Sequence, residues 1–361
     1  MTKQDKPINW TFIIDSIKKD KSVLILGPEL VKLHDNKTMH QLICDYLNVF
    51  NNERIKRYYP NDELFFFEDN VSKLMVCSDI RKFYQQKFEI KLFEKIAFMP
   101  FPLIISLNPD LFLKDTFERF KFPVQFAYYS RSEVMDLKPI STDNPLIYNL
   151  FGTIENDETL ILTHDDLFDF ISWITAADKL PQKMQEVINK SQNFIFVGFK
   201  FDKWYLQLIL RMLNPQRLKY QFALESDLLF ETQTFYLDQF RLDFFNVGVE
   251  EFIEDLYNHC SEANMLRKKY SDNEKLSSFL NRLMIEGKVE LVFEKITEFF
   301  ETSGKDKDES LVNDIVLLRS RLGRLNRKIG KGIIDSREAD LEENKIYNST
   351  LELIKEIAIY E

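Results

Sequence analysis

Short apolar runs alternate with helical patterns over the first 260 residues of the chain. A continuous apolar run such as 22–26 is typical of a strand that is buried on both faces of a sheet. Strands are expected at residues 22–26, 103–107, 122–129, 144–153, 159–162, 193–197, 218–224 and 241–247. Helices are expected at residues 8–19, 38–50, 71–98, 163–178, 180–191, 203–213, 228–239 and 250–258. The alternation predicts an α/β fold: a Rossmann-like, mostly parallel sheet with helices on both of its faces.

Residues 51–70 interrupt this alternation. They have no regular period and are rich in aromatic side chains, namely Tyr58, Tyr59, Phe65, Phe66 and Phe67. Such a segment fits either a lid over a pocket or the filling of a core. Because aromatic clusters usually pack together, core filling is the favoured interpretation.

The pattern changes after Cys260. Residues 261–274 are polar and are interpreted as a linker between a first domain, residues 1–260, and a second domain, residues 275–361. The second domain shows only helical periodicity, which predicts a small all-α bundle. On its long helix we expect an inward-facing stripe formed by Leu311, Ile315, Leu318, Leu322, Leu325 and Ile329. The same helix carries a basic strip, which is either a solvated face or a partner-binding surface: Arg319, Arg321, Arg324, Arg327 and Lys328.

Composition restricts the classes of function. The formal net charge of −10 argues against a broad nucleic-acid interface. No apolar run approaches the roughly 20 residues needed to span a bilayer, and the polar N-terminal residues lack the apolar centre of a signal peptide. Cys44, Cys77 and Cys260 lie far apart, which is typical of a reducing compartment. We therefore expect a cytoplasmic protein with no nucleic-acid or membrane partner.

Polar and small residues follow two of the predicted strands. Because open parallel sheets bind ligands at the carboxyl ends of their strands, these residues are candidates for a binding site. The loop that begins at Gly27 is a weak phosphate-binding signal, since Pro28 removes an amide donor. For Asn108 and Asp110 the spacing alone favours an ordinary turn in which Asp110 caps the next helix over a ligand site. The candidates at these two strand ends are Gly27, Asn108 and Asp110.

No metal site is predicted. His164, Asp165 and Asp166 are consecutive, and consecutive residues of a helix point in different directions, so they do not form a ligand set. Thr163 and the acidic residues after it fit a helix N-terminus instead. The scattered cysteines have no Cys-x-x-Cys spacing, which excludes a zinc ribbon.

The order of the motifs resembles the sirtuin-like (silent information regulator type) NAD-binding domain of bacterial defence proteins. The likeness covers about residues 8–258. It rests on Gly27 after a buried strand, Asn108-x-Asp110, Tyr148-Asn149-Leu150-Phe151-Gly152, Leu162-Thr163-x-x-Asp166 and Gly198-Phe199-x-Phe201-Asp202. Residues 275–361 resemble a bacterial effector-associated domain, on Leu318-x-Ser320-Arg321-Leu322-x-Arg324-Leu325, Gly332 and Asn344. The resemblance implies NAD⁺ as ligand or substrate, no metal, and a helical adaptor that binds other proteins and forms homo-oligomers.

The family's site residues map onto single positions of this chain. Asn108 matches the asparagine that contacts the nicotinamide ribose, and Asp110 matches the acidic residue beside the nicotinamide; both would be catalytic in an active enzyme. Gly152 matches the glycine of the family's His-Gly pair, but Phe151 replaces the histidine, which is the general base. A phenyl ring has no lone pair to accept a proton. The resemblance implies a nucleotide-binding set of Gly27, Glu29, Asn108, Asp110, Phe151, Gly152, Gly198 and Phe199.

The first loop also departs from the family pattern. The family has Gly-Ala-Gly where this chain has Gly27-Pro28-Glu29, and Glu29 brings negative charge toward phosphates. Losing a general base typically costs about 10²–10⁴ in rate. We therefore expect a degenerate domain, a pseudoenzyme that acts as a scaffold or as a sensor of NAD⁺ or ADP-ribose in antiphage immunity. The alternative is an active NAD⁺ glycohydrolase that depletes NAD⁺ on infection. Deacetylase activity is not expected.

Overall fold

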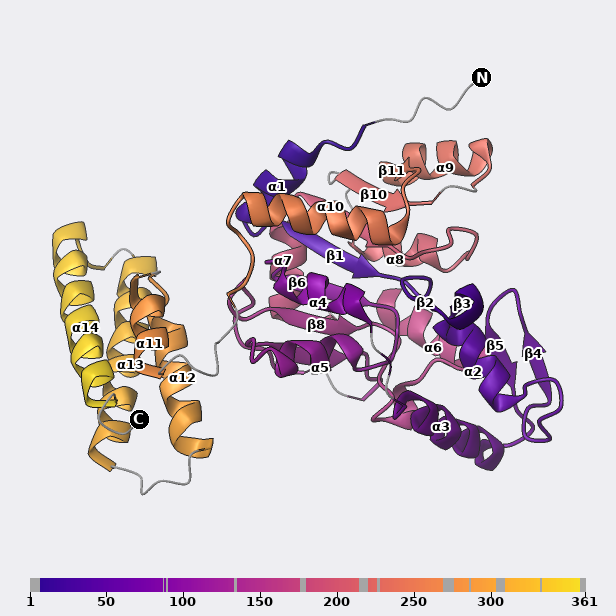
Figure 1. The fold of residues 1–361 in the computed structure, drawn as a ribbon, viewed down its shortest axis with the longest axis horizontal. Coiled ribbons are helices and arrows are strands. Elements are labelled where there is room, and N and C mark those ends of the chain that lie inside the picture. The colour runs from indigo at the N-terminus through magenta and orange to yellow at the C-terminus, as the bar shows by residue number, and fades with distance from the viewer. Residues whose placement is uncertain are drawn as a thin grey trace. The chain divides into compact units, whose positions relative to one another are not determined.

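The chain divides into two compact units, Met1–Lys269 and Tyr270–Glu361. The structure, a computed structural model, describes residues 7–361 except 87, 89, 133–134, 176–179, 214–219, 226–227, 269–275, 286, 303–308, 332 and 358–361. Figure 1 labels the helices and strands of both units.

A seven-stranded sheet forms the centre of the first unit (Figure 1). Its strands are β1 (Ser22–Leu26), β6 (Leu103–Ser106), β7 (Gln125–Tyr128), β8 (Leu146–Asn149), β9 (Asn193–Val197), β10 (Tyr220–Leu224) and β11 (Leu242–Phe245). They lie in the order β11-β10-β9-β1-β6-β8-β7, and every neighbouring pair is parallel. All five residues of β1 are buried, as its continuous apolar run predicts. The predicted Rossmann-like α/β sheet is confirmed.

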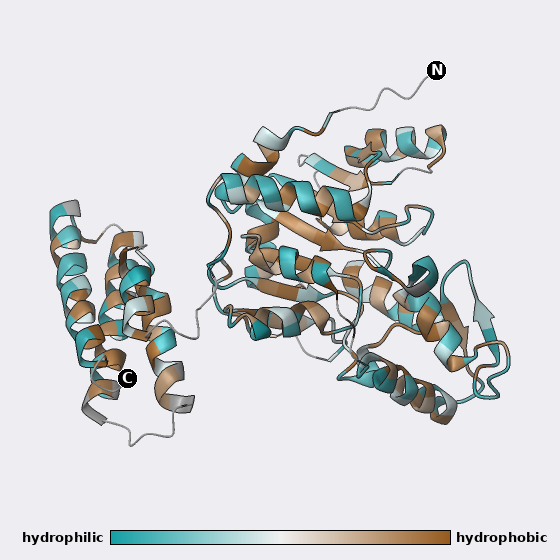
Figure 2. Ribbon diagram, in the orientation of Figure 1, coloured by the Kyte–Doolittle hydropathy of each residue, from teal (hydrophilic) through white to brown (hydrophobic). Residues whose placement is uncertain are grey.

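Helices cover both faces of the sheet. One face packs on α1 (Trp10–Lys18), α4 (Lys91–Phe98), α5 (Phe112–Arg119) and α10 (Val249–Glu262). The other face packs on α6 (His164–Thr175), α7 (Gln182–Lys190), α8 (Leu206–Leu213) and α9 (Phe230–Phe240). Figure 2 shows apolar strands between helices whose outer sides are polar. Because the side chains of a strand alternate in direction, neighbouring residues of β1 enter different cores: Val23 and Ile25 on one face, Leu24 and Leu26 on the other.

A smaller layer lies between β1 and β6 in the sequence. It contains α2 (Met39–Leu47), the antiparallel hairpin of β4 (Arg57–Tyr59) and β5 (Leu64–Phe66), and α3 (Asn70–Tyr84), which share a core of their own. The short elements before α2 are β2 (Lys32–Leu33), the 3₁₀ turn η1 (His34–Asn36) and β3 (Lys37–Thr38). The expectation of an irregular segment at 51–70 was therefore wrong, since β4 and β5 pair there. The single helix expected at 71–98 is two helices, because α3 ends at Tyr84 and α4 begins at Lys91.

The strand expected at residues 159–162 is also absent. The structure has a 3₁₀ turn, η2 (Asp157–Thr159), followed by extended residues that pair with no strand of the sheet. The reason is that the carboxylate of Asp166 accepts the amides of Leu162 and Thr163, at 3.2 and 3.0 Å, so these donors cannot enter a ladder. A backbone hydrogen bond joins this segment to β5 of the hairpin, from the Phe65 amide to the Leu162 carbonyl at 2.8 Å.

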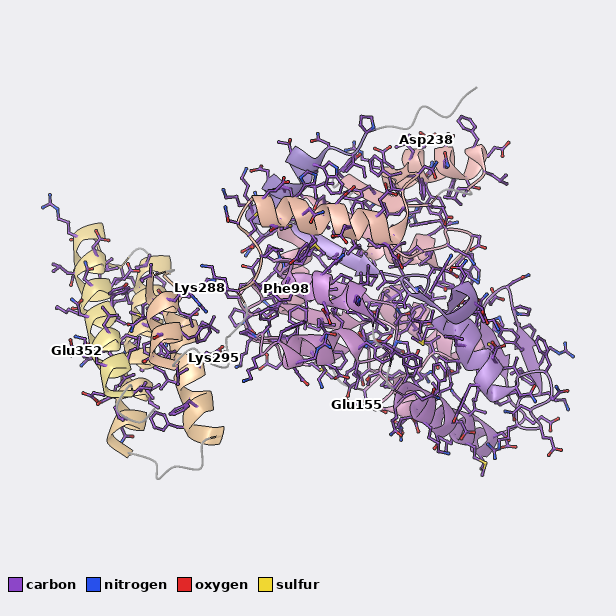
Figure 3. The ribbon with its side chains drawn as sticks, viewed as in Figure 1. Phe98, Glu155, Asp238, Lys288, Lys295 and Glu352 are labelled. Carbon is purple, nitrogen blue, oxygen red and sulfur yellow. The ribbon has the colours of Figure 1, made fainter. Side chains whose placement is uncertain are left out.

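The segment after α10 stays attached to the first unit. α10 continues to Glu262, and the amide of Arg267 donates to the carbonyl of Phe98 at 2.8 Å; Phe98 is labelled in Figure 3. The Arg267 guanidinium donates to the carbonyls of Ala97, at 3.1 Å, and Phe101, at 2.9 Å. The first part of the polar segment 261–274 thus has fixed partners in the first unit, although its composition predicts a linker.

The second unit is a four-helix arrangement in its described residues. Its helices are α11 (Leu276–Ile285), α12 (Val289–Thr302), α13 (Glu309–Gly330) and α14 (Ser336–Ile357). The inward stripe of α13 is confirmed from Leu311 to Leu325, but Ile329 is 47% exposed. Ile329 lies in the last turn of α13, beyond Leu325, which is the last residue of that helix in the core. Among the described helices, none is both long enough and apolar enough to span a bilayer.

Candidate functional site

The carboxyl ends of the central strands form the candidate site. The chain leaves β1 toward β6 on one side of the sheet and reaches β9 on the other side, so β1 marks the position where the strand order reverses. Open α/β sheets bind ligands in the crevice at such a reversal. The loops that follow β1, β6, β8 and β9 carry the candidate residues predicted from the sequence.

The backbone amide groups of the loop after β1 donate hydrogen bonds to carbonyl groups of the protein. The Gly27 amide donates to the Val197 carbonyl at 2.9 Å, the Glu29 amide to the Gly198 carbonyl at 2.8 Å, and the Leu30 amide to the Gly27 carbonyl at 3.2 Å. Pro28 has no amide hydrogen. Every N–H group from residue 27 to residue 30 is therefore absent or already bonded, and none is left to bind a phosphate.

The glycines of this region serve backbone packing. A Cβ on Gly27 would lie 2.2 Å from the Gly198 carbonyl oxygen, and a Cβ on Gly198 would lie 2.3 Å from the Leu30 nitrogen. Gly198 also has φ +76°, a conformation that side chains disfavour. These glycines bring the loops after β1 and β9 into direct backbone contact, so no ligand is needed to explain them.

Asn108 and Asp110 occupy different surroundings. The Asn108 side chain donates to the Gly27 carbonyl at 3.3 Å and so ties the β6 loop to the β1 loop. The Asp110 carboxylate accepts the Phe112 amide at 3.0 Å, which fits a turn before α5, but the N-cap residue of that helix is Leu111 and not Asp110 as predicted. Burial raises the pKa of Asp110 from 3.8 to about 7. The structure brings Asn108 to the cavity described below, whereas Asp110 is not among the residues that line it.

The raised pKa of Asp110 predicts a dependence of stability on pH. Between about pH 4 and pH 7 the unfolded carboxyl is ionised while the folded one holds its proton, so this group's contribution to stability falls as the pH rises. A rise from 3.8 to about 7 corresponds to about 4 kcal/mol at most. Asp110→Asn keeps the acceptor for Phe112 but adds an N–H group that needs a partner, so we expect a net gain of about 2 kcal/mol at pH 8.

The measurement for Asp110→Asn is urea unfolding of wild type and variant at pH 4.5 and pH 8. The gain should be present at pH 8 and should turn into a loss of about 1 kcal/mol at pH 4.5, where the carboxyl penalty is nearly gone and the unpaired N–H group remains. Asp115→Asn is the comparison variant: Asp115 lies on α5, which follows Asp110, and burial raises its pKa as well, so we expect a change of the same sign but smaller than that of Asp110→Asn. An equal effect of Asp110→Asn at both pH values would show that the carboxyl is ordinarily ionised in the folded protein.

Phe151 and Gly152 follow β8. The Phe151 ring lies edge-on to Phe170, with centroids 5.3 Å apart, and is tilted against Tyr205 at 5.8 Å. Gly152 has φ +82°, and a Cβ there would lie 2.0 Å from the Thr159 carbonyl oxygen. The position of the expected histidine is therefore filled by an aromatic ring that is packed on two others, beside a glycine that the local backbone requires.

Asn108 and Phe151 line one cavity of about 110 Å³. Its walls are mainly apolar and come from α2, the hairpin turn, α3 and the loops after β1, β6 and β8. His40 of α2 lines the same cavity, which sequence reasoning missed. The spacing of His40 and Cys44 on one helix face was the available signal, since residues four apart lie side by side.

His40 is neutral at physiological pH. Burial, and then the charge of Lys203, lower its pKa to about 4. Its Nε2 lies 3.1 Å from the Tyr58 hydroxyl and 3.3 Å from the Cys44 sulfur. Burial raises the pKa of Cys44 to about 11, so this thiol carries its proton and is not an activated nucleophile. The geometry gives a neutral imidazole engaged with a hydroxyl and a thiol.

Asp166 belongs to an ion-pair cluster outside this cavity. Its carboxylate is 5% exposed, lies 2.6 Å from Lys73 Nζ and 3.1 Å from Arg131 Nη2, and accepts the Thr163 hydroxyl at 2.8 Å. Burial raises its pKa, but Lys73 and the hydrogen bonds from Thr163 outweigh burial, so the pKa lies below its usual value. Neighbouring His164 turns to Asp62 instead, with Nε2 3.2 Å from Oδ2. Within the described residues, no group of three or more potential ligands could hold a metal ion.

Comparison with known proteins assigns both units. A family described as "SIR2-like domain" matches residues 102–234, and one described as "Effector-associated domain 11" matches residues 277–358. Residues 102–234 are thus similar to a SIR2-like domain. The SIR2-like match runs from β6 to the first part of α9 and so includes Asn108, Phe151 and Gly198, while β1 and the hairpin lie before it.

The effector-associated match coincides with α11 to α14. A solved structure titled "Structural Basis for the Mechanism and Regulation of Sir2 Enzymes" is 10% identical, covers 71% of this chain and 98% of its own, and has a TM-score of 0.36. No curated protein sequence matches the chain. A SIR2-like domain joined to an effector-associated domain indicates an effector of the defence-system type.

Proposed function

We propose that the SIR2-like unit has lost NAD⁺ cleavage and works in bacterial antiphage immunity as a scaffold or as a sensor of NAD⁺ or ADP-ribose. The effector-associated unit couples it to protein partners, and the working form is a homo-oligomer. The observation that carries the proposal is Phe151, which lines the cavity beside Asn108 where the resemblance places a histidine base.

The chemistry at Phe151 supports the loss of activity. A phenyl ring cannot accept a proton, and the contacts with Phe170 and Tyr205 hold this ring in an aromatic cluster. Binding determinants are weakened as well. The amides of residues 27–30 are bonded internally, and Glu29 adds a negative charge to the loop that would face a phosphate.

One observation favours the alternative, an active NAD⁺ glycohydrolase. His40 lines the same cavity as Asn108, and it is a neutral imidazole that retains a lone pair. Against this alternative, its Nε2 already faces Tyr58 and Cys44. The cavity of about 110 Å³ is also smaller than the roughly 300 Å³ or more of typical small-molecule sites.

Nicotinamide release from NAD⁺ tests the proposal. We expect release by the purified full-length protein to equal that of buffer, because the general base is missing. Release that disappears in both Asn108→Ala and His40→Ala would contradict the proposal and establish the hydrolase. Phe151→His then reports the cause of inactivity: release that appears would show that the missing base alone is responsible.

Thermal stabilisation separates the two inactive roles. A sensor binds its nucleotide in the folded state, so NAD⁺ or ADP-ribose at about 100 times its dissociation constant should stabilise the first unit by about 2.7 kcal/mol. A pure scaffold shows no shift with either nucleotide.

The helical unit supplies the coupling in both cases. The basic strip of α13 lies on the exposed face of that helix, where an Arg319 nitrogen lies 3.6 Å from a Glu294 oxygen of α12.

A further inference from the structure

Four charged side chains fill the crevice at the reversal of strand order. Lys200 Nζ lies 3.0 Å from Glu29 Oε1, and Lys203 Nζ lies 3.8 Å from Glu63 Oε1. The space left between these residues is about 10 Å³, which is about the volume of one water probe. The place where such sheets hold a dinucleotide is thus occupied by two glutamates and two lysines of the protein itself.

Glu63 is the member of this group that comes from outside the sheet loops. It lies in the turn between β4 and β5 and has φ 60°, an uncommon conformation for a residue other than glycine. The turn is held in place by the two residues before Glu63, because Lys203 Nζ donates to the Asn61 carbonyl and Asp62 pairs with His164. The hairpin therefore inserts Glu63 into the crevice as a plug.

The plug separates two spaces that would otherwise be continuous. The crevice and the 110 Å³ cavity share Pro28, Glu63, Leu107 and Tyr205 as walls. Asn108 and Phe151 line the cavity, and Lys200 and Lys203 line the crevice. Withdrawal of the Glu63 side chain would join these two spaces into one cleft at the carboxyl edge of the sheet.

We propose that Lys200 and Lys203 form a binding site for the diphosphate group of a nucleotide, and that Glu63 occupies this site in the free protein. The ligand class rests on the proposed function as a nucleotide sensor. The choice of Lys200, Lys203 and Glu63 rests on the ion pairs Lys200–Glu29 and Lys203–Glu63.

Charge explains how a ligand displaces the plug. The amides of residues 27–30 cannot hold a phosphate, so ammonium groups must do so, and Lys200 and Lys203 are the cations among the described walls of the crevice. In the free protein the carboxylates of Glu29 and Glu63 take the place of phosphate oxygens. A diphosphate carries more charge than one carboxylate and binds both lysines. Burial raises the pKa of Glu63, because the charged carboxylate is less stable in the crevice than in water. Withdrawal of the side chain into water removes this desolvation penalty.

Calorimetric titration with ADP-ribose tests the proposal on the full-length protein. Glu63→Ala keeps the backbone of the turn and removes the plug, so we expect ADP-ribose to bind about tenfold more tightly than to wild type. Glu68→Ala is the matched control, because Glu68 lies just after the same hairpin and pairs with Lys56, away from the crevice. Its affinity should equal that of wild type. Adding Lys203→Met to Glu63→Ala should remove the gain.

Two outcomes would overturn the proposal. One is an unchanged or weaker affinity in folded Glu63→Ala, and the other is a gain that persists in the Glu63→Ala, Lys203→Met protein. If Glu63→Ala fails to fold, Glu63→Gln keeps the size of the side chain and removes its charge, and it should shift the affinity in the same direction by a smaller factor. Cleavage of NAD⁺ by wild type would overturn the proposed function without altering these binding results, since ADP-ribose has no nicotinamide to release.

Discussion

Gly198→Ala is expected to destabilise the first unit by about 3–5 kcal/mol, which is a large part of the stability of a typical domain. The new Cβ would lie 2.3 Å from both the nitrogen and the Cα of Leu30, and these are backbone atoms that cannot move aside alone. The residue would also keep φ +76°, which adds strain. The Glu29 amide would lose its 2.8 Å bond to the Gly198 carbonyl if the loops moved apart. Denaturant unfolding of the full-length protein, followed by tryptophan fluorescence, measures this change.

Gly248→Ala is the matched control for this substitution. Gly248 precedes α10 with φ −65°, and no atom lies within 4 Å of the Cβ that alanine would add. Its effect should not exceed about 1 kcal/mol, because alanine is less favourable than glycine as a helix N-cap by roughly this amount and no contact is strained. A loss of less than 1 kcal/mol in Gly198→Ala would mean that the two loops separate easily and that their close contact is not a structural requirement.

Asp166→Ala is expected to cost about 3–5 kcal/mol, because it leaves partly buried Lys73 without its counter-ion and removes the acceptor of the Leu162 and Thr163 amides. The pKa of Asp166 is lowered in the folded state, so its contribution is complete above the unfolded pKa of about 4 and is lost as the pH falls through the folded value. The difference between wild type and variant should therefore be constant from pH 6 to pH 8 and should shrink in acid.

Asp165→Ala serves as the control for Asp166→Ala, since Asp165 is the preceding residue of the same helix and is exposed. Surface substitutions of this kind usually change stability by less than about 0.5 kcal/mol. Equal losses for Asp165→Ala and Asp166→Ala would show that negative charge at the start of α6 matters in general, whereas the structure assigns the effect to the specific partners of Asp166.

The central sheet was predictable because its strands are buried on both faces. The apolar runs at Ser22–Leu26 and Asn193–Val197 have no polar alternation that could be mistaken for another element. Residues 160–162 are just as apolar, yet they are not a strand, because the carboxylate of Asp166 accepts the amides of Leu162 and Thr163. Asp166 lies outside the apolar run, so the run itself gave no sign of these bonds. The β4–β5 hairpin was missed since strands of three residues leave too short a pattern to detect.

The candidate site was predictable where its residues follow strands and unpredictable where they do not. Asn108 was found because it follows a predicted strand, and Phe151 was found through the family resemblance; the two line the same cavity. His40 and Glu63 come from the layer inserted between β1 and β6, and nothing in the local sequence places that layer over the cavity. The ion pair between Glu63 and Lys203 could not be predicted from the sequence, because no periodic pattern relates a hairpin turn to the loop after β9.

The backbone contact between Gly27 and Gly198 has a consequence for how relatives of this protein should be sorted. A residue that is needed to bring two loops together remains necessary after the chemistry beside it has disappeared, so glycine motifs will identify inactive proteins as readily as active ones. The side chain at the position of Phe151 and the bonding of the amides at residues 27–30 are independent of that requirement. A survey that scores these two features would divide the group by catalytic capacity, and one that scores the glycines would only collect proteins of the same architecture.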